Sequence, residues 1–515
     1  MTGVRRTARS ALEPVLLAAL GALHTLVFVE TAFGLAQIGA VALLAWRVAL
    51  AAPRRAALLG FAFGTGWLCA GTWWLFVSMH RYGGLPAWMA ALAVLCLAAV
   101  LSLYLAAAMA AVARWRGTGV LRFALLFAAA WLLAELARGV LFTGFPWLAS
   151  GYAQVDSPLA GFAPWVGVYG MGALAAGLAG ALGASVAGLA RAEVGRARVL
   201  APPALALGAA LVAGAVLGRQ DFTQPTGTLS VSLLQGNVPQ DEKFSARYVP
   251  EALAGTAAQF AAARGQLVVG PETVIPLLPS QLDPEYMQAL RAPFVRPGRA
   301  AVFGIPLGDP ASGYTNSALG ISAGTAATAA GAYRYDKHHL VPFGEFIPLG
   351  FRWFTRMMNI PLGDFNRGPE TAPSFPFLGE RIAPNICYED LFGEELAARF
   401  VPAAEAPTIL ANISNIGWFG RTVALDQHLH ISRLRSLELQ RPMLRATNTG
   451  TTAVIDHRGA VTHSLPVHTR GVLEATVQGR TGNTPFTDWA GRFGLWPLWA
   501  IGVATLVFFA RRRPA

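Results

Sequence analysis

The sequence predicts a multi-pass α-helical membrane protein that carries an inserted α/β domain, and three observations support this fold class. The 515 residues are 54% hydrophobic and only 13% charged, which is about half the charge of an ordinary soluble domain. Long apolar runs fill residues 1–219 and return near the carboxyl terminus. Between them, short β-rich runs alternate with helical patterns, and this alternation is typical of an α/β sheet.

Eight apolar runs are candidates for membrane-spanning helices, because a span needs about 20 apolar residues. They cover residues 11–28, 31–50, 57–79, 86–112, 122–141, 163–189, 200–217 and 494–510. The first two are short and closely spaced around Glu30, so one re-entrant hairpin is an alternative for them. The basic start, VRRTARS, is not followed by a clean small-residue cleavage site, and we interpret it as an anchor and not as a removed signal.

Arginine clusters predict the orientation of the chain. They precede the first run, follow the second, fourth and sixth, and close the chain. Cytoplasmic loops of membrane proteins are enriched in Lys and Arg, so this pattern predicts cytoplasmic termini and an extracytoplasmic domain. It also explains the net charge of +12 better than nucleic-acid binding does. We therefore expect membrane helices over 1–219, an extracytoplasmic domain over 220–489, and a final span with a basic tail over 490–515.

The segment 220–489 has the pattern of an α/β domain. Its predicted strands are LSVSLLQGN, QLVVGPET, AAVFGIPLG, RIAPNICYED, PTILANISN and TTAVIDHRG, and its predicted helices cover 245–264, 282–291, 391–400 and 424–440. Polar residues follow the strand ends, where α/β folds place their chemistry. Within the apolar loop 340–375, we interpret FRWFTRMMNIPLGDF (351–365) as an amphipathic arm or lid.

Three strand ends carry residues suited to acyl transfer. They are VVGPETVIP with Glu272, YDKHHLVPFGEFIP with Lys337 and Glu345, and NICYED with Cys387 and Glu389. A carboxylate can take the proton of a thiol nucleophile, and an ammonium can stabilise first the thiolate and then an oxyanion. The chain has only two lysines among many arginines, which suggests that Lys337 is needed for its compact ammonium.

Other readings of these strand ends stay open. Cys387 could be a buried structural cysteine near two surface ions. The histidines of KHHL, His338 and His339, could supply the base or bind a metal, although neighbouring residues of a strand point to opposite faces. Three cysteines give neither a disulfide framework nor a zinc pattern.

The motifs resemble those of a known family. GPETVIP, DKHHLVPFGEFIP, NICYED and SNIGWFG are similar to the signature segments of the nitrilase superfamily, with its Glu-Lys-Cys triad. LQGNVPQDEKF and the membrane segments GTWWLFVSMHRYGGLP and GFPWLASGYAQVDSPLAGFAPWVGVYG are similar to the bacterial apolipoprotein N-acyltransferases. This resemblance covers nearly the full length. It implies an α-β-β-α sandwich on a bundle of about eight helices.

The resemblance also implies roles for individual residues. By matching motifs, Cys387 is the nucleophile, Glu272 the general base and Lys337 the oxyanion-stabilising cation. The matched supporting residues are Glu345, Glu389, Tyr388 through its backbone N–H, and Trp418 at the border of the pocket. Two positions depart from the family pattern. Ile416-Gly417 stands where an acid is common, and Phe244 stands where an indole is common, so a polar role at either position is in doubt.

The activity implied by the resemblance is transfer of a fatty acyl chain from a phospholipid, with phosphatidylethanolamine as the expected donor. The acceptor would be the N-terminal amino group of an S-diacylglyceryl cysteine on a lipoprotein. We expect ping-pong kinetics, no metal or organic cofactor, no nucleic-acid partner, a monomer, and a place in the bacterial inner membrane. The alternatives are a membrane-tethered amidase or nitrilase that hydrolyses small amides, and a transporter or binding module with an inactive enzyme domain.

Overall fold

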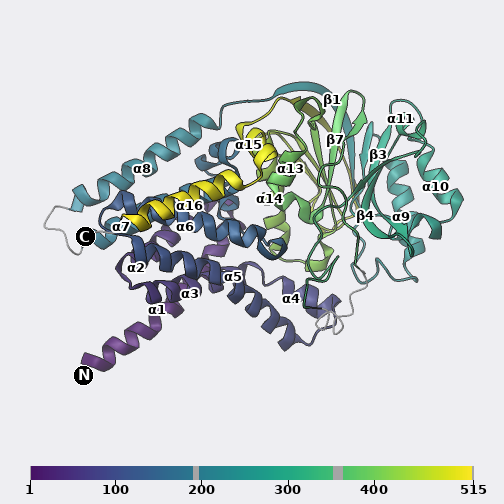
Figure 1. Cartoon of the computed structure of the whole chain (residues 1–515). Coiled ribbons are helices and arrows are strands. Elements are labelled where there is room, and N and C mark those ends of the chain that lie inside the picture. The colour runs from purple at the N-terminus through teal and green to yellow at the C-terminus, as the bar shows by residue number, and fades with distance from the viewer. Residues whose placement is uncertain (1, 190–195, 352–363, 513–515) are drawn as a thin grey trace. The chain divides into compact units, whose positions relative to one another are not determined.

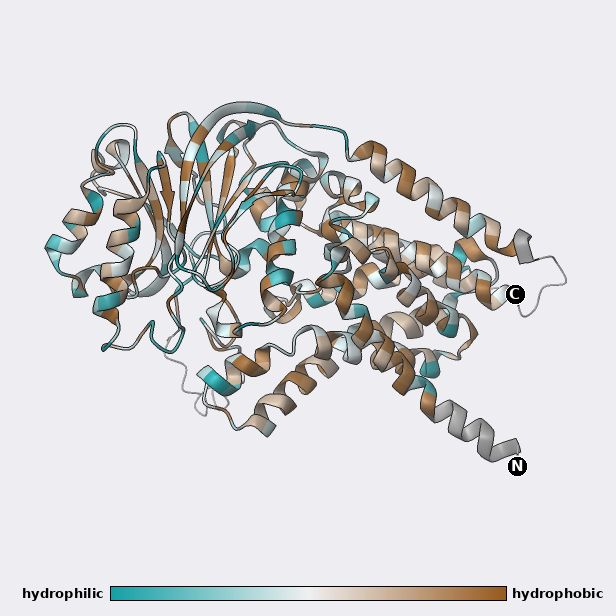
Figure 2. Ribbon diagram, turned by 180° about the vertical axis from the view of Figure 1, so that it is seen from behind, coloured by the Kyte–Doolittle hydropathy of each residue, from teal (hydrophilic) through white to brown (hydrophobic). Residues whose placement is uncertain are grey.

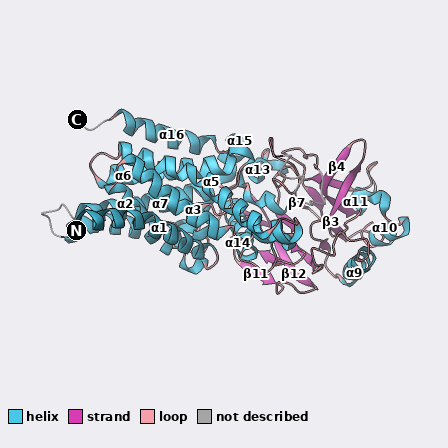
Figure 3. Ribbon diagram, turned by 90° about the horizontal axis from the view of Figure 1, so that it is seen from below, coloured by secondary structure: helices cyan, strands magenta, loops and turns pink. Residues whose placement is uncertain are grey.

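The computed structural model describes residues 2–189, 196–351 and 364–512 (Figure 1). The chain divides into two compact units. The helical unit comprises Met1–Phe76, Ala87–Gln220 and Phe493–Ala515, and the α/β unit comprises Val77–Pro86 and Asp221–Arg492. All strands among the described residues belong to the α/β unit (Figure 3). The arm predicted over 351–365 lies almost entirely outside the described residues.

The helical unit is built from long apolar helices and short 3₁₀ turns, and hydrophobic residues line most of its helical turns (Figure 2). Its helices are α1 (Thr2–His24), α2 (Ala36–Leu50), α3 (Pro53–Gly71), α5 (Ala87–Trp115), α6 (Val120–Val140), α7 (Ala163–Leu189), α8 (Arg196–Leu217) and α16 (Trp496–Arg511). Helix α4 (Leu75–Val77) and a π-helical turn (Ser78–Tyr82) lead into the α/β unit. The 3₁₀ turns of the helical unit are η1 (Thr25–Phe28), η2 (Thr31–Phe33), η4 (Leu141–Thr143), η5 (Ser150–Gln154) and η6 (Pro158–Phe162).

The described helices support a membrane bundle but do not confirm the predicted number of spans. Four are long and apolar enough to cross a membrane, namely Ala87–Trp115, Val120–Thr143, Pro158–Leu189 and Val199–Leu217, and two bent helix pairs raise the total to six. The apolar helices Leu12–Phe28 and Ala36–Leu50 fall short. The second has 15 residues, so it rises about 22 Å, whereas the hydrocarbon core is about 30 Å thick. The predicted total of eight spans is therefore not confirmed in the described part of the chain.

Small residues let the helices of this unit approach closely. A Cβ atom on Gly66 of α3 would lie 1.9 Å from the carbonyl oxygen of Ala18 on α1, and one on Gly21 would lie 2.0 Å from that of Phe63. Such contacts are typical of helix pairs in membranes, where packing between backbones replaces the hydrophobic effect as the driving force. Glycine is therefore required at both positions for α1 and α3 to pack in this way.

A buried ion pair fixes the loop that follows α6. Glu135 and Arg138 lie three residues apart on one face of that helix, with 3.5 Å between the guanidinium and the carboxylate. Glu135 accepts hydrogen bonds from the backbone N–H and the hydroxyl of Ser150 at 2.7 and 2.6 Å. Arg138 donates to the carbonyl oxygens of Phe145 and Trp147. The polar atoms of the loop thus find partners among apolar helices, where an unpaired group is costly.

The α/β unit contains two six-stranded sheets. The first has the order β12-β1-β2-β3-β4-β5 and the second β11-β10-β9-β8-β7-β6. The first-sheet strands are β12 (Gly471–Thr481), β1 (Gln224–Gln235), β2 (Leu267–Val269), β3 (Ala300–Asp309), β4 (Gly313–Ser322) and β5 (Tyr333–Asp336). The second-sheet strands are β11 (Val461–Ser464), β10 (Ala453–Ile455), β9 (Met443–Thr447), β8 (Ile409–Ser414), β7 (Glu380–Ile386) and β6 (Phe375–Phe377).

The two sheets pack face to face, and helices cover their outer faces. A core of branched side chains, such as Val231 and Val302 from one sheet and Ile386 and Ile413 from the other, fills the space between them. A second core joins the first sheet to α9 (Val249–Ala262) and α10 (Pro284–Arg291), and a third joins the second sheet to α13 (Gly393–Ala398), α14 (Ala424–Leu439) and α15 (Pro485–Phe493). The remaining short elements are η7 (Pro279–Gln281), α11 (Ala323–Ala326), η8 (Cys387–Leu391), η9 (Ala403–Glu405) and η10 (Ile416–Phe419). This arrangement is the α-β-β-α sandwich that the resemblance implied.

Strand direction brings the predicted chemistry to one edge of each sheet. Strands β1, β2 and β3 run parallel, and β5 shares their direction because β4 is antiparallel to both neighbours. Strands β7, β8 and β9 of the second sheet are also parallel. Residues that directly follow β2, β5, β7 and β8 therefore gather at the carboxyl ends of the strands.

Candidate active site

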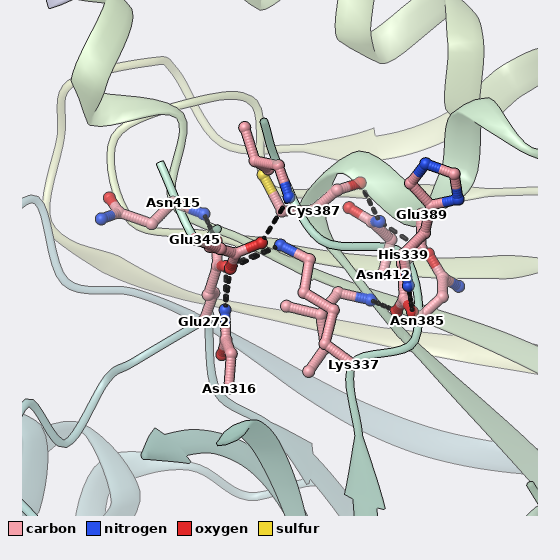
Figure 4. A network of polar contacts seen from close by, with 12 residues as sticks. Glu272, Asn316, Lys337, His339, Glu345, Asn385, Cys387, Glu389, Asn412 and Asn415 are labelled. Carbon is pink, nitrogen blue, oxygen red and sulfur yellow. Dashed lines mark hydrogen bonds and ion pairs between the residues drawn. The ribbon is translucent and has the colours of Figure 1, made fainter. Parts of the chain in front are cut away.

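The carboxyl ends of three strands bring together the predicted nucleophile, base and cation. Glu272 follows β2, Lys337 follows β5, and Cys387 follows β7. Figure 4 shows the three side chains converging, and the charges of Glu272 and Lys337 both act on the thiol. Glycine at position 304 of β3 permits this arrangement, because a Cβ there would lie 2.7 Å from the Cα of Glu272.

Lys337 is a fully buried cation shared by two carboxylates. Its Nζ lies 2.9 Å from Oε1 of Glu345 and 3.5 Å from Oε1 of Glu272, and the side chain is only 1% exposed. Asn316 on β4 joins the same two carboxylates, since its Nδ2 donates to both Oε1 atoms at 2.7 Å. Burial lowers the pKa of Lys337, but the neighbouring carboxylates raise it by more, so its ammonium form persists.

Glu272 is kept ionised although it is buried. Desolvation raises its pKa, but four neighbouring groups together bring the pKa below its ordinary value. They are Lys337, the amide of Asn316, Lys243 and the backbone N–H of Asn415. The N–H of Asn415, just after β8, donates to Oε2 at 2.8 Å. The second lysine, Lys243, donates to the backbone carbonyl of Glu272 at 3.0 Å. Burial lowers the pKa of Lys243 to about 8.

Cys387 keeps its proton in the resting site. Burial first, and then the charge of Glu272, raise the pKa of its thiol to about 12, although Lys337 opposes them. The residue begins η8 with a backbone φ of +53°, in the left-handed region that is uncommon for residues other than glycine. Its side chain remains partly exposed. The thiol is therefore reachable, and a base must remove its proton as it attacks.

Glu389 connects the cysteine loop to the segment that carries Lys337. Its carboxylate accepts from the backbone N–H of Ile386 at 2.6 Å and from those of His338 and His339 at 2.7 and 3.2 Å. The hydroxyl of Tyr335 donates to it at 2.8 Å. Burial raises the pKa of Glu389, while Lys337 and these donors oppose that effect. Glu389 thus lies where it can fix the spacing between the nucleophile and the cation.

The two adjacent histidines have other partners. His338 bonds the carbonyl oxygen of Gly368 through Nδ1, and His339 bonds Glu395 through Nδ1 at 2.8 Å and stacks on Phe392. Within the described residues, no three His, Cys, Asp or Glu side chains form a group that could hold a metal. Among the described residues, the two histidines therefore bind different partners and do not share one ligand position.

Trp418 belongs to an aromatic cluster beside the site. Its ring lies 6.4 Å from that of Phe244, nearly parallel, and 5.8 Å from that of Tyr82, edge to face. Phe244 directly follows Lys243, which reaches the backbone of Glu272. Phe244 therefore keeps an aromatic face where an indole is common. At the other departure, Ile416 is 1% exposed and places an apolar side chain where an acid is common.

Several polar residues of the site were not predicted from the sequence. Asn316 lies in the middle of β4, where only its position opposite two glutamates gives it importance. Asn415 acts through its backbone N–H, which no side-chain pattern can indicate. Lys243 is one of only two lysines in the chain and lies in the family-like segment LQGNVPQDEKF, but it was not included among the predicted site residues. The scarcity of lysine and that segment were the signals that pointed toward it.

The fold agrees with what comparisons of the sequence reveal. Residues 20–181 match the family model for the apolipoprotein N-acyltransferase N-terminal domain, and residues 230–486 match that for carbon-nitrogen hydrolases. The chain is 53% identical over 484 residues to a Verminephrobacter eiseniae protein named apolipoprotein N-acyltransferase, covering 89% of this chain and 88% of that one. It is 49% identical over 506 residues to a Ralstonia nicotianae protein of the same name, covering 97% and 94%. The chain belongs to the apolipoprotein N-acyltransferase family.

Proposed function

We propose that this protein moves a fatty acyl chain from a phospholipid to the N-terminal amino group of an S-diacylglyceryl cysteine on a lipoprotein, through a thioester on Cys387. The observation that carries the proposal is the convergence of Cys387 with an ionised Glu272 and the buried ammonium of Lys337. Membership of the family supports acyl transfer, and the apolar helices support a lipid donor.

The first half-reaction acylates the thiol. The carboxylate of Glu272 takes the thiol proton while Sγ of Cys387 attacks the ester carbonyl carbon. The resulting oxyanion is stabilised by the ammonium of Lys337 and the backbone N–H of Tyr388. When the tetrahedral intermediate collapses, the ester C–O bond breaks. The leaving alkoxide of the lysophospholipid takes the proton from Glu272, and a neutral thioester remains.

The second half-reaction returns the site to its starting state. The neutral amine of the lipoprotein attacks the thioester carbonyl, and Glu272 takes a proton from the attacking nitrogen. The C–S bond then breaks, and the thiolate of Cys387 takes that proton back. The sum is an ester and an amine converted to an amide and an alcohol, with no change in oxidation state. Two half-reactions through one covalent intermediate give ping-pong kinetics.

Acyl transfer is favoured over hydrolysis of small amides by the surroundings of the site. The aromatic cluster of Trp418, Phe244 and Tyr82 offers an apolar wall, and the same chain supplies long apolar helices. A long acyl chain can make apolar contacts with the aromatic cluster and with the apolar helices. We further propose that the protein is a monomer in the bacterial inner membrane, with both termini in the cytoplasm and the α/β unit on the periplasmic side. Reporter fusions at residue 515 that are active on only one side of the membrane test that orientation.

Intact-mass spectrometry of the full-length protein in detergent tests the chemistry. After incubation with phosphatidylethanolamine alone, we expect the wild-type mass to rise by one acyl group, because no acceptor is present to complete the cycle. Cys387→Ser should show no such increase. Cys69→Ser and Cys96→Ser are matched controls, since both thiols are free and lie on helices of the other unit, and they should be acylated like wild type.

Addition of an acceptor peptide separates the two enzyme classes. A synthetic peptide that begins with S-diacylglyceryl cysteine should gain the acyl chain while the enzyme mass returns to its starting value. An acyl adduct that persists in Cys387→Ser would refute the assigned nucleophile. Release of free fatty acid, with no acylated peptide, would instead support the amidase-like alternative.

A further inference from the structure

The peptide bond between Cys387 and Tyr388 is held from behind by two buried side chains. The carbonyl oxygen of Cys387 accepts hydrogen bonds from Nδ2 of Asn412 on β8 and from Nε2 of His428 on α14, each at 3.3 Å. The side chains of Asn412 and His428 are at most 1% exposed. None of the steps described above uses either side chain.

One arginine sets the proton position of His428. Nη2 of Arg445 on β9 lies 2.7 Å from Nδ1 of the histidine. A guanidinium can only donate, so Nδ1 must carry the lone pair and the proton must lie on Nε2. Burial and the charge of Arg445 also lower the pKa of His428, which keeps the ring neutral. His428 therefore donates through Nε2, and this N–H is shared between the carbonyl oxygen of Cys387 at 3.3 Å and Oδ1 of Asp390 at 3.0 Å.

The same arginine orients Asn412. Nη1 of Arg445 lies 3.5 Å from Oδ1 of Asn412. On the other side of the same amide, Nδ2 of Asn412 donates to Oδ1 of Asn385 at 2.7 Å. Both contacts require the amide to present its oxygen to the guanidinium and its NH₂ group to the cysteine loop. Arg445 thus fixes the orientation of both donors that contact the carbonyl oxygen of Cys387.

An acid on the cysteine loop completes this cluster. The carboxylate of Asp390 accepts hydrogen bonds from Nε2 of His428 at 3.0 Å and from the hydroxyl of Ser432. It also lies 3.7 Å from Nη1 of Arg445. Burial of these charged groups without their partners would be costly. The cluster therefore ties η8 to α14 and β9 through a set of charges that compensate one another.

Peptide geometry carries this restraint into the site. The C=O of Cys387 and the N–H of Tyr388 belong to one planar trans peptide and point in opposite directions. Donors that fix the direction of the carbonyl oxygen therefore also fix the direction of that N–H. Rotation of this peptide would move the N–H away from the oxyanion without displacing the sulfur.

We propose that His428 and Asn412, both oriented by Arg445, are positioning residues that aim the backbone N–H of Tyr388 at the oxyanion of the acylation step. The inference rests on the proposed function, since it assigns this N–H to the oxyanion. A purely structural cluster would affect all reactions of the thiol equally. The inference instead predicts that variants of the cluster selectively slow the reactions that pass through an oxyanion.

Two reagents applied to the full-length enzyme separate these effects. Acylation by p-nitrophenyl butyrate passes through a tetrahedral oxyanion. Alkylation by iodoacetamide does not, because the thiol displaces iodide directly. Removing a whole oxyanion donor costs about 10²- to 10³-fold in rate, so loosening one costs less. We expect His428→Phe to slow acylation by about 10- to 100-fold but alkylation by less than about threefold.

Two further variants keep the test independent of folding. His428→Gln retains an N–H near the position of Nε2 and should acylate within about threefold of wild type, whereas Asn412→Ala should show the selective loss. His430→Phe, on the same helix and partly exposed, is the matched control and should match wild type in both reactions.

Three outcomes would overturn the inference. They are an equal loss in both reactions for His428→Phe, no loss in either reaction, and a His428→Gln variant as slow as His428→Phe. The butyrate ester also keeps this test separate from the donor assignment. Failure of the wild type to accept phospholipid would refute the proposed function and leave the comparison of variants valid.

Discussion

Asn316 gives the sharpest test of how the base and the cation are held. Its Nδ2 donates one hydrogen bond to Glu272 and one to Glu345, each at 2.7 Å, and both carboxylates also contact Lys337. Asn316→Leu has a similar volume and removes both donors at once. We expect this variant to fold and to acylate slowly, because Glu272 then loses the contact that fixes its Oε1 atom.

The size of the effect follows from the two hydrogen bonds. A hydrogen bond to a charged group contributes about 1.5 to 3 kcal/mol. Loss of about 2 kcal/mol from the Glu272 bond alone corresponds to a rate about 30-fold lower, since about 1.4 kcal/mol is tenfold. Loss of the hydrogen bond to Glu345 lowers the stability of the fold and also adds a smaller part to the loss of rate. Asn316→Leu should therefore acylate about 30- to 100-fold more slowly than wild type.

Asn316→Asp should make the acylation rate depend on pH. A third carboxylate between Glu272 and Glu345 repels both, and a pair of unit charges 4 Å apart interacts by about 4 kcal/mol at an effective dielectric constant of 20. The repulsion raises the pKa of the cluster, so it holds an extra proton at lower pH. The protonated carboxyl can then donate as the amide did. The Asp variant should therefore acylate faster at about pH 5.5 than at about pH 7.5.

Intact-mass time courses with phosphatidylethanolamine at several pH values measure these rates. Asn366→Leu is the matched control, because Asn366 is exposed and donates to the backbone of Ser312 and not to a carboxylate of the site. An Asn316→Leu variant within about threefold of wild type would refute the argument that these hydrogen bonds position Glu272. An Asn316→Asp variant that is slow at every pH would refute the argument that charge causes its defect.

Two further predictions follow from the buried charges. Wild-type acylation should change little between about pH 5.5 and 7.5, because the lowered pKa of Glu272 keeps it ionised there and the thiol of Cys387, with a pKa of about 12, keeps its proton. The rate should fall only as the pH drops through the lowered pKa of Glu272. A tenfold fall in rate between about pH 5.5 and 7.5, measured by intact mass, would contradict this prediction. Tyr335→Phe removes the 2.8 Å hydrogen bond to Glu389 and should lower the thermal midpoint in detergent by several degrees, since loss of this hydrogen bond costs about 1.5 to 3 kcal/mol. Tyr333→Phe, which loses a bond to a backbone carbonyl in an exposed setting, should lower the midpoint less, and equal losses would contradict the role given to Glu389.

The sequence predicted those parts of the site that depend on strand ends. Glu272, Lys337 and Cys387 each follow a short apolar run, and parallel strands bring such positions to one edge. Asn316 could not be found in this way, because it lies within the antiparallel strand β4, which the strand pattern did not predict. His428 was hidden for another reason. Its helix has a mixed polar pattern that suggests a solvated face, whereas the structure buries His428 and Ser432 against Arg445 of β9.

The helical unit shows a similar division. Long apolar runs predicted α5, α6, α7 and α8 because length and hydropathy are sufficient for such helices. Short runs are harder to assign, and α2, with 15 residues, falls below the length that marks a span. The contact between Glu135 and Arg138 was predictable because residues three apart share a helix face. Its partner Ser150 lies beyond a turn that no periodicity indicates.

The protonated state of Cys387 has a consequence for how long the enzyme survives. Thiolates attack peroxides and disulfides far more readily than thiols do, and cysteines of low pKa are the ones most often lost to sulfenic and sulfinic acids. The periplasmic side that we propose for the α/β unit is a compartment that promotes such oxidation. A sulfur that ionises only while a substrate occupies the site gives oxidants little opportunity, so this nucleophile should outlast one that rests as an ion pair.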